Sequence, residues 1–328
     1  MQLGAYNACL GDKTLTEALD IIAGLGLTSV EINSGGFLPP IHLPVEDLRS
    51  SEDARQQYLG EFASRGLTLT ALNCNGNPLH PAAGFPHSQE LIDSIALAAL
   101  LGVKRLVTMS GTPGGEPGTS VPVWNPLPWW SPFLDVQDHQ WSVAIRYWKD
   151  IQARAADADV TIAIEMHPGN IVFNPRTMHR LAEEVGATHL GAEMDPSHLF
   201  WQGIDPVLAV ADLGELVVIA AAKDTRINEA AKVNGVIDDS FYRVAEGEPG
   251  HLPMGGGTTL SGWPRTASWD FVAVGRGHDT AYWTEFLRAL HKIDPDMPVN
   301  IEHEDQELDQ VEGLRFAANT LIEAEKAI

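Results

Sequence analysis

The stretch HLGAEMDPSHLF, residues 189–200, decides the fold and raises the question of function. Its first half, 189–194, is a short apolar run with the length and composition of a buried β-strand. The run stops at Asp195, which is followed by a proline and, three positions beyond the acid, by His198. An Asp-Pro pair is typical of a turn. A turn does not explain why acids also end two other apolar runs of this chain.

Seven further runs resemble residues 189–194, and amphipathic helical patterns lie between them. The runs cover residues 2–7, 28–33, 67–74, 103–109, 160–166, 215–222 and 298–303. The helical patterns cover residues 14–26, 88–102, 138–157, 176–186, 205–213, 278–293 and 307–326. Near-continuous apolar runs are typical of strands that are covered on both faces of a parallel sheet. Eight strands alternating with helices predict an α/β fold with a single domain over 1–328, a (β/α)8 TIM barrel.

Polar and small residues predict where two of these helices begin and end. Thr14, with Glu17 three positions later, predicts the start of the first helix. Ser88 predicts the start of another helix and Gly102 its end.

Two connections are too long for plain turns, and both follow strands. Residues 110–137 come after the fourth strand, and residues 224–277 come after the seventh. TIM barrels build their active sites from the loops at this end of the strands, so we expect these loops to cover the site. Trp124 and Trp129 of the first loop are candidates for stacking on a sugar ring. The alternative is that such tryptophans only hold a long loop against the barrel.

The charge and composition exclude several classes of function. Lys and Arg number 21 and Asp and Glu 44, which gives a net charge of −23. A chain this acidic repels the phosphates of nucleic acids, so we expect no nucleic-acid partner. No apolar run approaches the roughly 20 residues that cross a bilayer, so no membrane is expected. Only Cys9 and Cys74 are present and no signal peptide is evident, which favours the cytoplasm.

Three acids end strand-like runs and are the candidate metal ligands. Glu165 ends the fifth run, Asp195 the sixth and Glu302 the eighth. A buried carboxylate is costly unless it is paired or bound to a cation, and lysines and arginines are scarce nearby. Three converging oxygens suit a hard divalent cation, for which we favour Mn²⁺, with Mg²⁺, Co²⁺ or Zn²⁺ as alternatives. The alternative is that the three acids form separate salt bridges or helix caps.

Several other side chains are candidates for catalysis or binding. His167 and His198 lie close to the acids in sequence and are the first candidates for an acid or a substrate contact. Lys223 is a candidate for holding an enolate oxygen, unless it pairs with Asp224 or Glu165. The remaining candidates are His251 and His278 for the metal, and Arg226 and Asn75 for the substrate.

Several segments resemble one known family. They are ALNCNGNPLHP (71–81), IEMHPGN (164–170), EMDPSHLFWQGIDP (193–206), AAKDTRIN (221–228), VGRGHDTAYW (274–283) and VNIEHEDQ (299–306). They are similar to the sugar phosphate isomerase/epimerase branch of the xylose-isomerase-like superfamily. These TIM barrels include tagatose and psicose epimerases, inosose-processing enzymes and AP endonucleases. The resemblance spans essentially the whole chain.

The resemblance implies a metal held by Glu165, Asp195 and Glu302, with His198 as a substrate contact. Many members carry a fourth ligand, a histidine, where this chain has Ala221. The resemblance therefore leaves His251, His278 or water to complete the metal shell.

The long loop after the seventh strand and the AAAKDTRIN pattern are also similar to the catalytic subunits of C-glycoside deglycosidases. In those proteins a Mn²⁺ barrel cleaves a 3-oxo-glycoside by elimination, and it pairs with a smaller subunit.

From the residues and the resemblance we predict a divalent-metal-dependent sugar isomerase or epimerase. Glu165 or Glu302 would remove a proton next to a carbonyl, and the metal would stabilise the enediolate. The first alternative is a C-glycoside deglycosidase subunit, a lyase. The second, supported by Ala221 alone, is a barrel without activity that binds a sugar or a partner. The expected partners are a sugar or glycoside and either further copies of the chain or a small subunit.

Overall fold

The computed structural model describes residues 1–328, and its eight parallel strands close into a barrel in the order β1-β12-β7-β6-β5-β4-β3-β2. The strands are β1 (Gln2–Tyr6), β2 (Ser29–Asn33), β3 (Thr68–Asn73), β4 (Arg105–Met109), β5 (Thr161–Glu165), β6 (Leu190–Met194), β7 (Val217–Ala222) and β12 (Pro298–Ile301). Each lies within one of the eight apolar runs of the sequence, and the predicted TIM barrel is confirmed.

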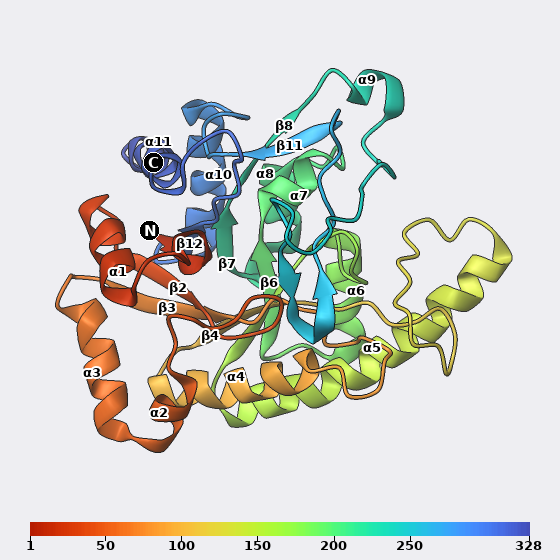
Figure 1. The fold of residues 1–328 in the computed structure, drawn as a ribbon, viewed down its shortest axis with the longest axis horizontal. Helices are drawn as coiled ribbons and strands as arrows, with labels where there is room; N and C mark the ends of the chain where they lie inside the picture. The colour runs from red at the N-terminus through yellow and green to blue at the C-terminus, as the bar shows by residue number, and fades with distance from the viewer.

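Helices surround the barrel, as Figure 1 shows. They are α1 (Leu15–Gly24), α2 (Val45–Ser50), α3 (Glu52–Ala63), α4 (His87–Leu101), α5 (Ser131–Asp157), α6 (Pro175–Val185), α7 (Pro196–Phe200), α8 (Pro206–Leu213), α10 (Thr280–Ile293) and α11 (Gln310–Glu325). None of them is both long enough and apolar enough to cross a bilayer. Their buried faces and the strands form one large apolar core.

Local signals in the sequence set most helix ends. Thr14 and Glu17 form a capping box at the start of α1, and Gly102 ends α4 with a φ of 71°. The prediction that Ser88 caps α4 is wrong, because the helix already begins at His87. The carbonyl of Pro86 accepts the first hydrogen bonds of this helix, from the backbone of residues 89 and 90.

The structure adds elements that the sequence patterns missed. Helices α2, α3 and α7 were not predicted, and α5 begins at Ser131, inside the segment expected to be a loop. Pro132 lies in the first turn of α5, where a proline costs no hydrogen bond. Short 3-10 turns, η1 (Asn7–Leu10) and η2 (Gly214–Leu216), flank two strands of the barrel.

A two-stranded antiparallel ribbon anchors the long segment that follows β7. It consists of β8 (Asp224–Ile227) and β11 (Trp269–Val272). Between them lie α9 (Ala231–Asn234), β9 (Pro253–Met254), η3 (Gly255–Gly257) and β10 (Thr258–Thr259). Trp269 stacks on Trp201 at a ring distance of 4.9 Å, and Trp263 packs on Trp269 at 4.8 Å. These tryptophans therefore hold the segment against the barrel.

The interior of the barrel contains a buried carboxylate that its neighbours satisfy. Glu31 on β2 accepts hydrogen bonds from the side-chain amides of Asn73, at 2.7 Å, and Asn300, at 3.0 Å. Asn300 also accepts one from Ser29 at 2.7 Å. Burial raises the pKa of Glu31 to about 7, although both amides act in the opposite direction.

Candidate metal centre

Three carboxylates from three separate strand ends meet at the mouth of the barrel. Glu165 is the last residue of β5, Asp195 follows β6, and Glu302 follows β12. One oxygen of each lies within 4.8 Å of the others. Asp195 also caps α7, because its Oδ1 accepts a hydrogen bond from the backbone of Ser197 at 2.8 Å. Parallel strands end on the same rim, which is why residues so far apart in sequence converge.

Two atoms of this cluster are buried and have no hydrogen-bond partner: Asp195 Oδ2 and His198 Nε2. The histidine nitrogen lies 3.2 Å from Glu165 Oε1 and 3.3 Å from Asp195 Oδ2 without a bonding geometry to either. A buried polar atom without a partner costs about 1–3 kcal/mol. A divalent cation would satisfy these atoms, and the donor set of carboxylates and imidazole fits one.

Lys223 is the cation of the cluster, and it is buried. Its Nζ lies 3.1 Å from Glu302 Oε1 and 3.0 Å from Glu304 Oε2. The alternative of a pairing with Asp224 or Glu165 is not what the structure has: Lys223 pairs with two acids that follow the neighbouring strand β12. The ring of Phe271 on β11 covers this ammonium group at 4.3 Å.

Burial and the neighbouring charges set the pKa values of the three acids. Burial, with the charge of Glu165 added to it, raises the pKa of Asp195 to about 7 in spite of Lys223. Burial likewise raises the pKa of Glu302 well above its usual range. Burial also acts to raise the pKa of Glu165, but contact with His198 and the charges of His167 and Lys223 outweigh it and lower that pKa to about 2. A bound cation would stabilise all three acids in their charged form.

The two histidines expected at the site lie beside Glu165. The rings of His167 and His198 are 4.0 Å apart, and one nitrogen of each lies within 4.8 Å of a Glu165 oxygen. Burial lowers the pKa of His198 to about 3, so its ring is neutral near pH 7. Asn75 donates a hydrogen bond from Nδ2 to Glu165 Oε2 at 2.5 Å. Asn75, expected to bind substrate, thus orients a candidate metal ligand.

His251 and His278, the histidines expected to replace the ligand missing at Ala221, do not join the carboxylates. His278 Nδ1 lies 2.7 Å from Asp224 Oδ1, and its ring stacks on Phe200. His251 Nδ1 lies 3.3 Å from the carbonyl oxygen of residue 244, within the long segment after β8. Each ring is held by its own neighbours, and we withdraw both as candidate ligands.

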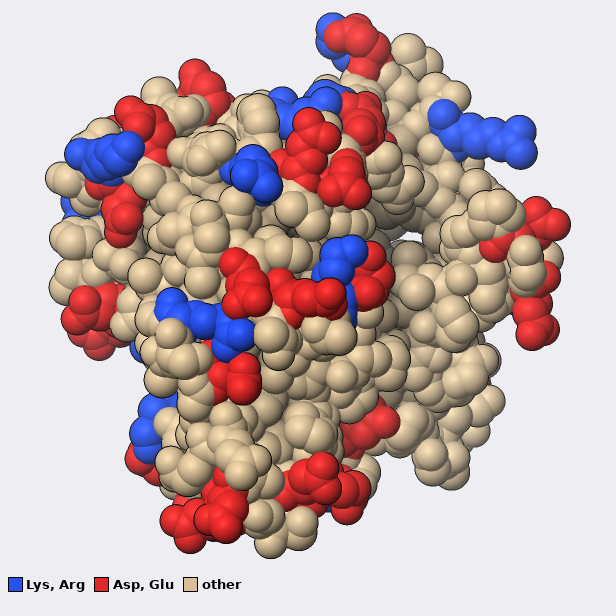
Figure 2. Space-filling view, turned by 60° about the vertical axis from the view of Figure 1, so that its left-hand side comes forward, with Lys and Arg blue, Asp and Glu red and all other residues tan.

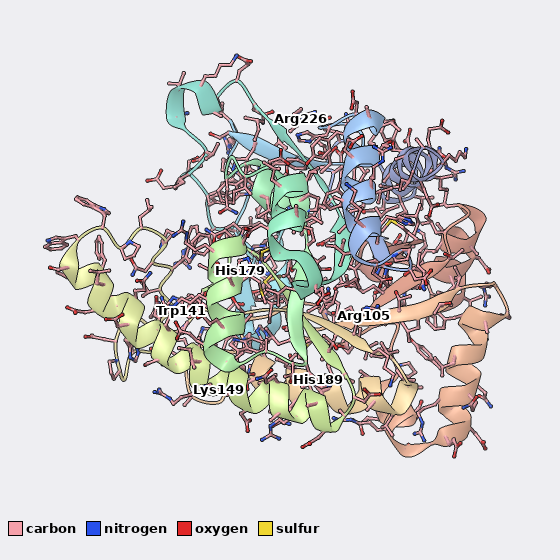
Figure 3. All side chains as sticks on the ribbon, turned by 180° about the vertical axis from the view of Figure 1, so that it is seen from behind. Arg105, Trp141, Lys149, His179, His189 and Arg226 are labelled. Carbon is pink, nitrogen blue, oxygen red and sulfur yellow. The ribbon has the colours of Figure 1, made fainter.

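The other expected substrate contacts are engaged by other residues or exposed. Trp124 Nε1 donates to the carbonyl oxygen of Asn170 at 3.1 Å, which anchors its loop. Trp129 is 85% exposed at the tip of the segment before α5. Arg226, labelled in Figure 3, lies in the upper part of that view, above Arg105. Its guanidinium is 2.8 Å from Glu307 Oε1, so an acid already neutralises it.

Three residues at the mouth were missed by sequence reasoning. Phe271 reaches both Lys223 and, at a ring distance of 5.4 Å, His198. Its place depends on the pairing of β8 with β11, which no sequence signal indicated. Glu193 is buried on β6 beside Glu165 in the strand register. A charged residue inside an apolar run was the available signal for Glu193, and it was overlooked. The third is Glu304, which contacts Lys223.

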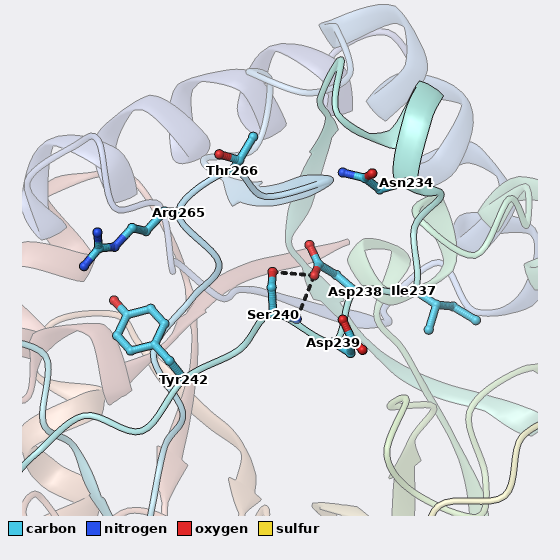
Figure 4. A pocket seen from close by; sticks show the side chains of 8 residues that line it. All are labelled: Asn234, Ile237, Asp238, Asp239, Ser240, Tyr242, Arg265 and Thr266. Carbon is cyan, nitrogen blue, oxygen red and sulfur yellow. Dashed lines mark hydrogen bonds between the residues drawn. The ribbon is translucent and has the colours of Figure 1, made fainter.

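A separate pocket lies on the long segment between β8 and β11, shown in Figure 4. Asp238, Tyr242 and Arg265 are among the residues that line it. None of the carboxylates of the metal centre lines this pocket. On the face that Figure 2 shows, acidic and basic side chains lie in separate groups on a surface formed mostly by other residues.

Comparison with known proteins identifies relatives of the chain. A family model described as xylose isomerase-like TIM barrel matches residues 19–320. A Bacillus subtilis (strain 168) protein described as uncharacterized protein YfiH is 34% identical over 327 residues, which are 98% of each chain.

Solved structures share the fold at low sequence identity. The probable 3-DHS dehydratase AsbF of Bacillus anthracis superposes with a TM-score of 0.65 at 13% identity, over 98% of this chain and 99% of that one. The 3-keto-D-glucoside 4-epimerase YcjR of E. coli superposes with a TM-score of 0.61 at 13% identity, over 99% of each chain. At these identities the two structures establish the fold alone.

Proposed function

Because the chain belongs to the xylose isomerase-like TIM barrel family, we propose that it is a divalent-metal-dependent sugar isomerase or epimerase. The observation that carries this proposal is the meeting of Glu165, Asp195 and Glu302 around the unpartnered Oδ2 of Asp195. We favour Mn²⁺ as the ion, because three carboxylate oxygens and open positions suit it. When bound, such an ion supplies Lewis-acid polarisation of a substrate carbonyl.

The chain's own residues would move the proton. The Glu302 side chain is 16% exposed, whereas the Glu165 side chain is only 1% exposed and is held by Asn75. Glu302 is therefore the better placed of the two to take a proton from the carbon next to the carbonyl. Lys223 contacts Glu302 and would steady the negative charge that develops on the oxygen. Returning the proton to the other face gives an epimer, and returning it to the neighbouring carbon gives an isomer.

His198 would supply a hydrogen-bond donor to the substrate. Its Nε2 has no partner within the protein, and it faces the same carboxylates. As a neutral ring it donates a hydrogen bond to a sugar hydroxyl without adding charge. Phe271, which covers the buried Lys223 and contacts the His198 ring, would exclude water from the part of the mouth next to these residues.

The test is hydrogen exchange on candidate substrates. Metal-loaded protein is incubated with keto-sugars and 3-oxo-glycosides in D₂O, and deuterium uptake next to the carbonyl is followed by NMR. Glu302→Gln and Glu165→Gln, with metal content measured, should lose about 100-fold or more in exchange rate. Glu323→Gln, an exposed acid on α11, is the matched control and should keep the wild-type rate. Full exchange by both variants with metal bound would refute the assignment of the base.

A second candidate is elimination from a 3-oxo-glycoside, in which the same proton is removed and a β-substituent leaves. The long segment after β7 and the AAAKDTRIN pattern favour it, because both are similar to the catalytic subunits of C-glycoside deglycosidases. The structural neighbour YcjR is named as acting on a 3-keto-D-glucoside, a substrate of the same class. Release of the aglycone by the protein, with or without a small subunit added, would distinguish elimination from epimerisation.

We propose that the chain works in the cytoplasm, either as an oligomer of identical chains or with a smaller subunit. Both cysteines are free, which supports a reducing compartment. Light scattering on the purified protein gives the number of chains, and copurification from its native host gives the subunit. A protein that never carries metal and is indifferent to EDTA would instead be a barrel without activity.

A further inference from the structure

We propose that the long segment after β7, residues 224–277, is a strap that crosses the mouth of the barrel and gates access to the metal centre. Its tip is the turn η3, which the loops after β2 and β3 hold in place. The backbone N–H of Gly255 in this tip donates to the carbonyl oxygen of Phe37 at 3.1 Å. The tip must lift before an ion or a sugar enters or leaves. The inference rests on the proposed function only for what passes the gate.

The topology of the barrel places the base and the tip of the strap on opposite sides of the mouth. In the closed strand order, β3 is the fourth strand from β7 in either direction. The strap leaves the rim after β7, and its tip lies against Phe37, which follows β2, and against Phe85 and His87, which follow β3. At its base, Phe271 covers Lys223 in the mouth at 4.3 Å. The strap therefore spans the mouth from one side to the other.

The tip fits the far rim because it carries no side chains. A Cβ on Gly255 would overlap the carbonyl oxygen of Gly36 and the ring of His87. A Cβ on Gly256 would overlap the ring of Phe85. Gly256 also has a φ of 73°, a conformation that favours glycine. The glycines therefore allow the backbone of the strap to lie directly on the rings of the far rim.

The far rim offers the tip a preformed surface. The rings of Phe37 and Phe85 pack edge-on against His87 at 5.2 Å and 4.7 Å. His80 stacks on Phe85 at 3.7 Å. The backbone N–H of Asn77 donates to His87 Nδ1 at 2.8 Å. These contacts fix the His87 ring in the position where the tip meets it.

The closed position leaves one buried polar group without a partner. Because His87 Nδ1 accepts a hydrogen bond, Nε2 carries the proton of the neutral ring. Burial lowers the pKa of His87 to about 4, which keeps the ring neutral near pH 7. Nε2 faces Gly255, is buried and has no acceptor. A buried N–H without a partner costs free energy, and water would satisfy it once the tip lifts. The closed position is therefore held only weakly.

The rest of the strap has little that holds it down. No residue of 226–263 is buried. Segments with few buried contacts open locally at a low cost in free energy. The base is different, because β8 pairs with β11 and Trp269 stacks on Trp201. We therefore expect the tip to move while the base stays in place, as in enzymes whose loops control the exchange of ligands.

The first test releases the tip by a single methyl group. Gly255 has no positive φ, so Gly255→Ala adds only the overlap with Gly36 and His87. Hydrogen–deuterium exchange of peptides that contain the tip should become about tenfold faster, because the bond to Phe37 is lost. Gly250→Ala is the matched control. Gly250 lies in the same strap with a φ of 85°, but a Cβ there meets no atom within 4 Å, so the tip should stay protected.

The second test measures how fast Mn²⁺ leaves. Each protein, shown to be folded by circular dichroism, is loaded with Mn²⁺ and mixed with excess EDTA, and the ion still bound is measured over time by atomic emission. Gly255→Ala should lose its ion about tenfold faster than the wild type and Gly250→Ala. Its equilibrium affinity for Mn²⁺ should change by less than about threefold, because an open gate speeds entry and exit alike.

Each result decides one part of the inference. A tip that exchanges as slowly in Gly255→Ala as in the wild type, or that is unprotected in the wild type, would overturn the latch. A wild-type rate of Mn²⁺ loss from a variant with an unprotected tip would overturn the gate. Protein that binds no Mn²⁺ would overturn the gate together with the proposed metal centre, and hydrogen exchange would still decide the latch.

Discussion

Two buried carboxylates of this barrel, Glu31 and Asp195, are treated differently by their neighbours. Both are almost inaccessible to solvent. Glu31, inside the barrel, receives side-chain amides from Asn73 and Asn300. Asp195, at the mouth, has one oxygen bonded to the backbone of Ser197, and its other oxygen has no donor.

The difference separates a structural acid from a binding acid. The chain itself supplies the donors of Glu31, so this network is complete without a ligand. At the mouth the chain instead leaves Asp195 Oδ2 and His198 Nε2 without partners, beside two further carboxylates. Such an arrangement costs stability unless something from outside the chain completes it. The contrast therefore predicts opposite consequences for mutations in the two places.

The largest effect is expected from Asp195→Asn. Loss of this ligand should weaken divalent-metal affinity by about 1000-fold, beyond the 10–100-fold loss typical of residues that only support a ligand. The unfolding free energy of the metal-free protein should stay the same or rise, because the change removes an uncompensated charge. Calorimetric titration with Mn²⁺ and urea unfolding measure the two quantities. Unchanged Mn²⁺ affinity would show that Asp195, like Glu31, does not bind the ion.

Glu31→Ala should show the reverse pattern. Two buried amides lose their acceptor and a cavity opens, so the unfolding free energy should fall by about 3 kcal/mol. Affinity for Mn²⁺ should change by less than about threefold, because Glu31 is not one of the candidate metal ligands. Urea unfolding and the same titration check both. A loss of metal affinity without a loss of stability would place Glu31 in the metal centre.

The pH dependence of stability should report Glu31 directly. Its pKa is about 7 in the folded protein, whereas an unfolded glutamate titrates near about 4.3. The folded state therefore binds the proton more tightly than the unfolded state. The resulting contribution to the unfolding free energy is fully present below about pH 4.3 and is lost as pH rises through about 7. Between about pH 4.5 and about pH 6.5 the loss should be about 2 kcal/mol.

Urea unfolding at a series of pH values measures how the unfolding free energy depends on pH, and Glu31→Gln should remove the part of this dependence that Glu31 contributes. Saturating Mn²⁺ should leave the Glu31 contribution in place. A slope that is the same in wild type and Glu31→Gln would show that the Glu31 pKa is not raised in the folded state.

Asn75→Ala should have a smaller effect on Mn²⁺ affinity, because Asn75 only donates a hydrogen bond to the candidate ligand Glu165. Without its amide on Glu165 Oε2, the ligand is less well oriented, and Mn²⁺ affinity should fall about tenfold. Asn77→Ala, which removes a loop amide bonded to residue 112, is the matched control. An Asn75→Ala protein with wild-type affinity would mean that Asn75 acts on the substrate and not on the ligand.

The fold and the meeting of the three acids follow from the sequence for a simple reason. Parallel strands that alternate with helices end on one rim, so acids that end such strands must approach one another. Glu165, Asp195 and Glu302 needed only that rule. The closeness of His198 to these acids also followed, because it is only three residues after Asp195 in the chain.

What the sequence could not show depends on pairings between distant segments. Lys223 is followed directly by Asp224 in sequence, yet it reaches Glu302 and Glu304 because β7 and β12 are neighbours. Phe271 reaches Lys223 through the ribbon that β11 forms with β8. His278 was a reasonable ligand by composition, but Asp224 and Phe200 hold it away from the carboxylates.

The most direct measurement is anomalous X-ray diffraction from crystals grown with Mn²⁺, with data collected at the manganese absorption edge. We expect a single strong anomalous peak between the carboxylates of Glu165, Asp195 and Glu302, within bonding distance of Asp195 Oδ2. A map with no peak among these three side chains at saturating Mn²⁺, or with Lys223 filling the space between them, would contradict the metal centre.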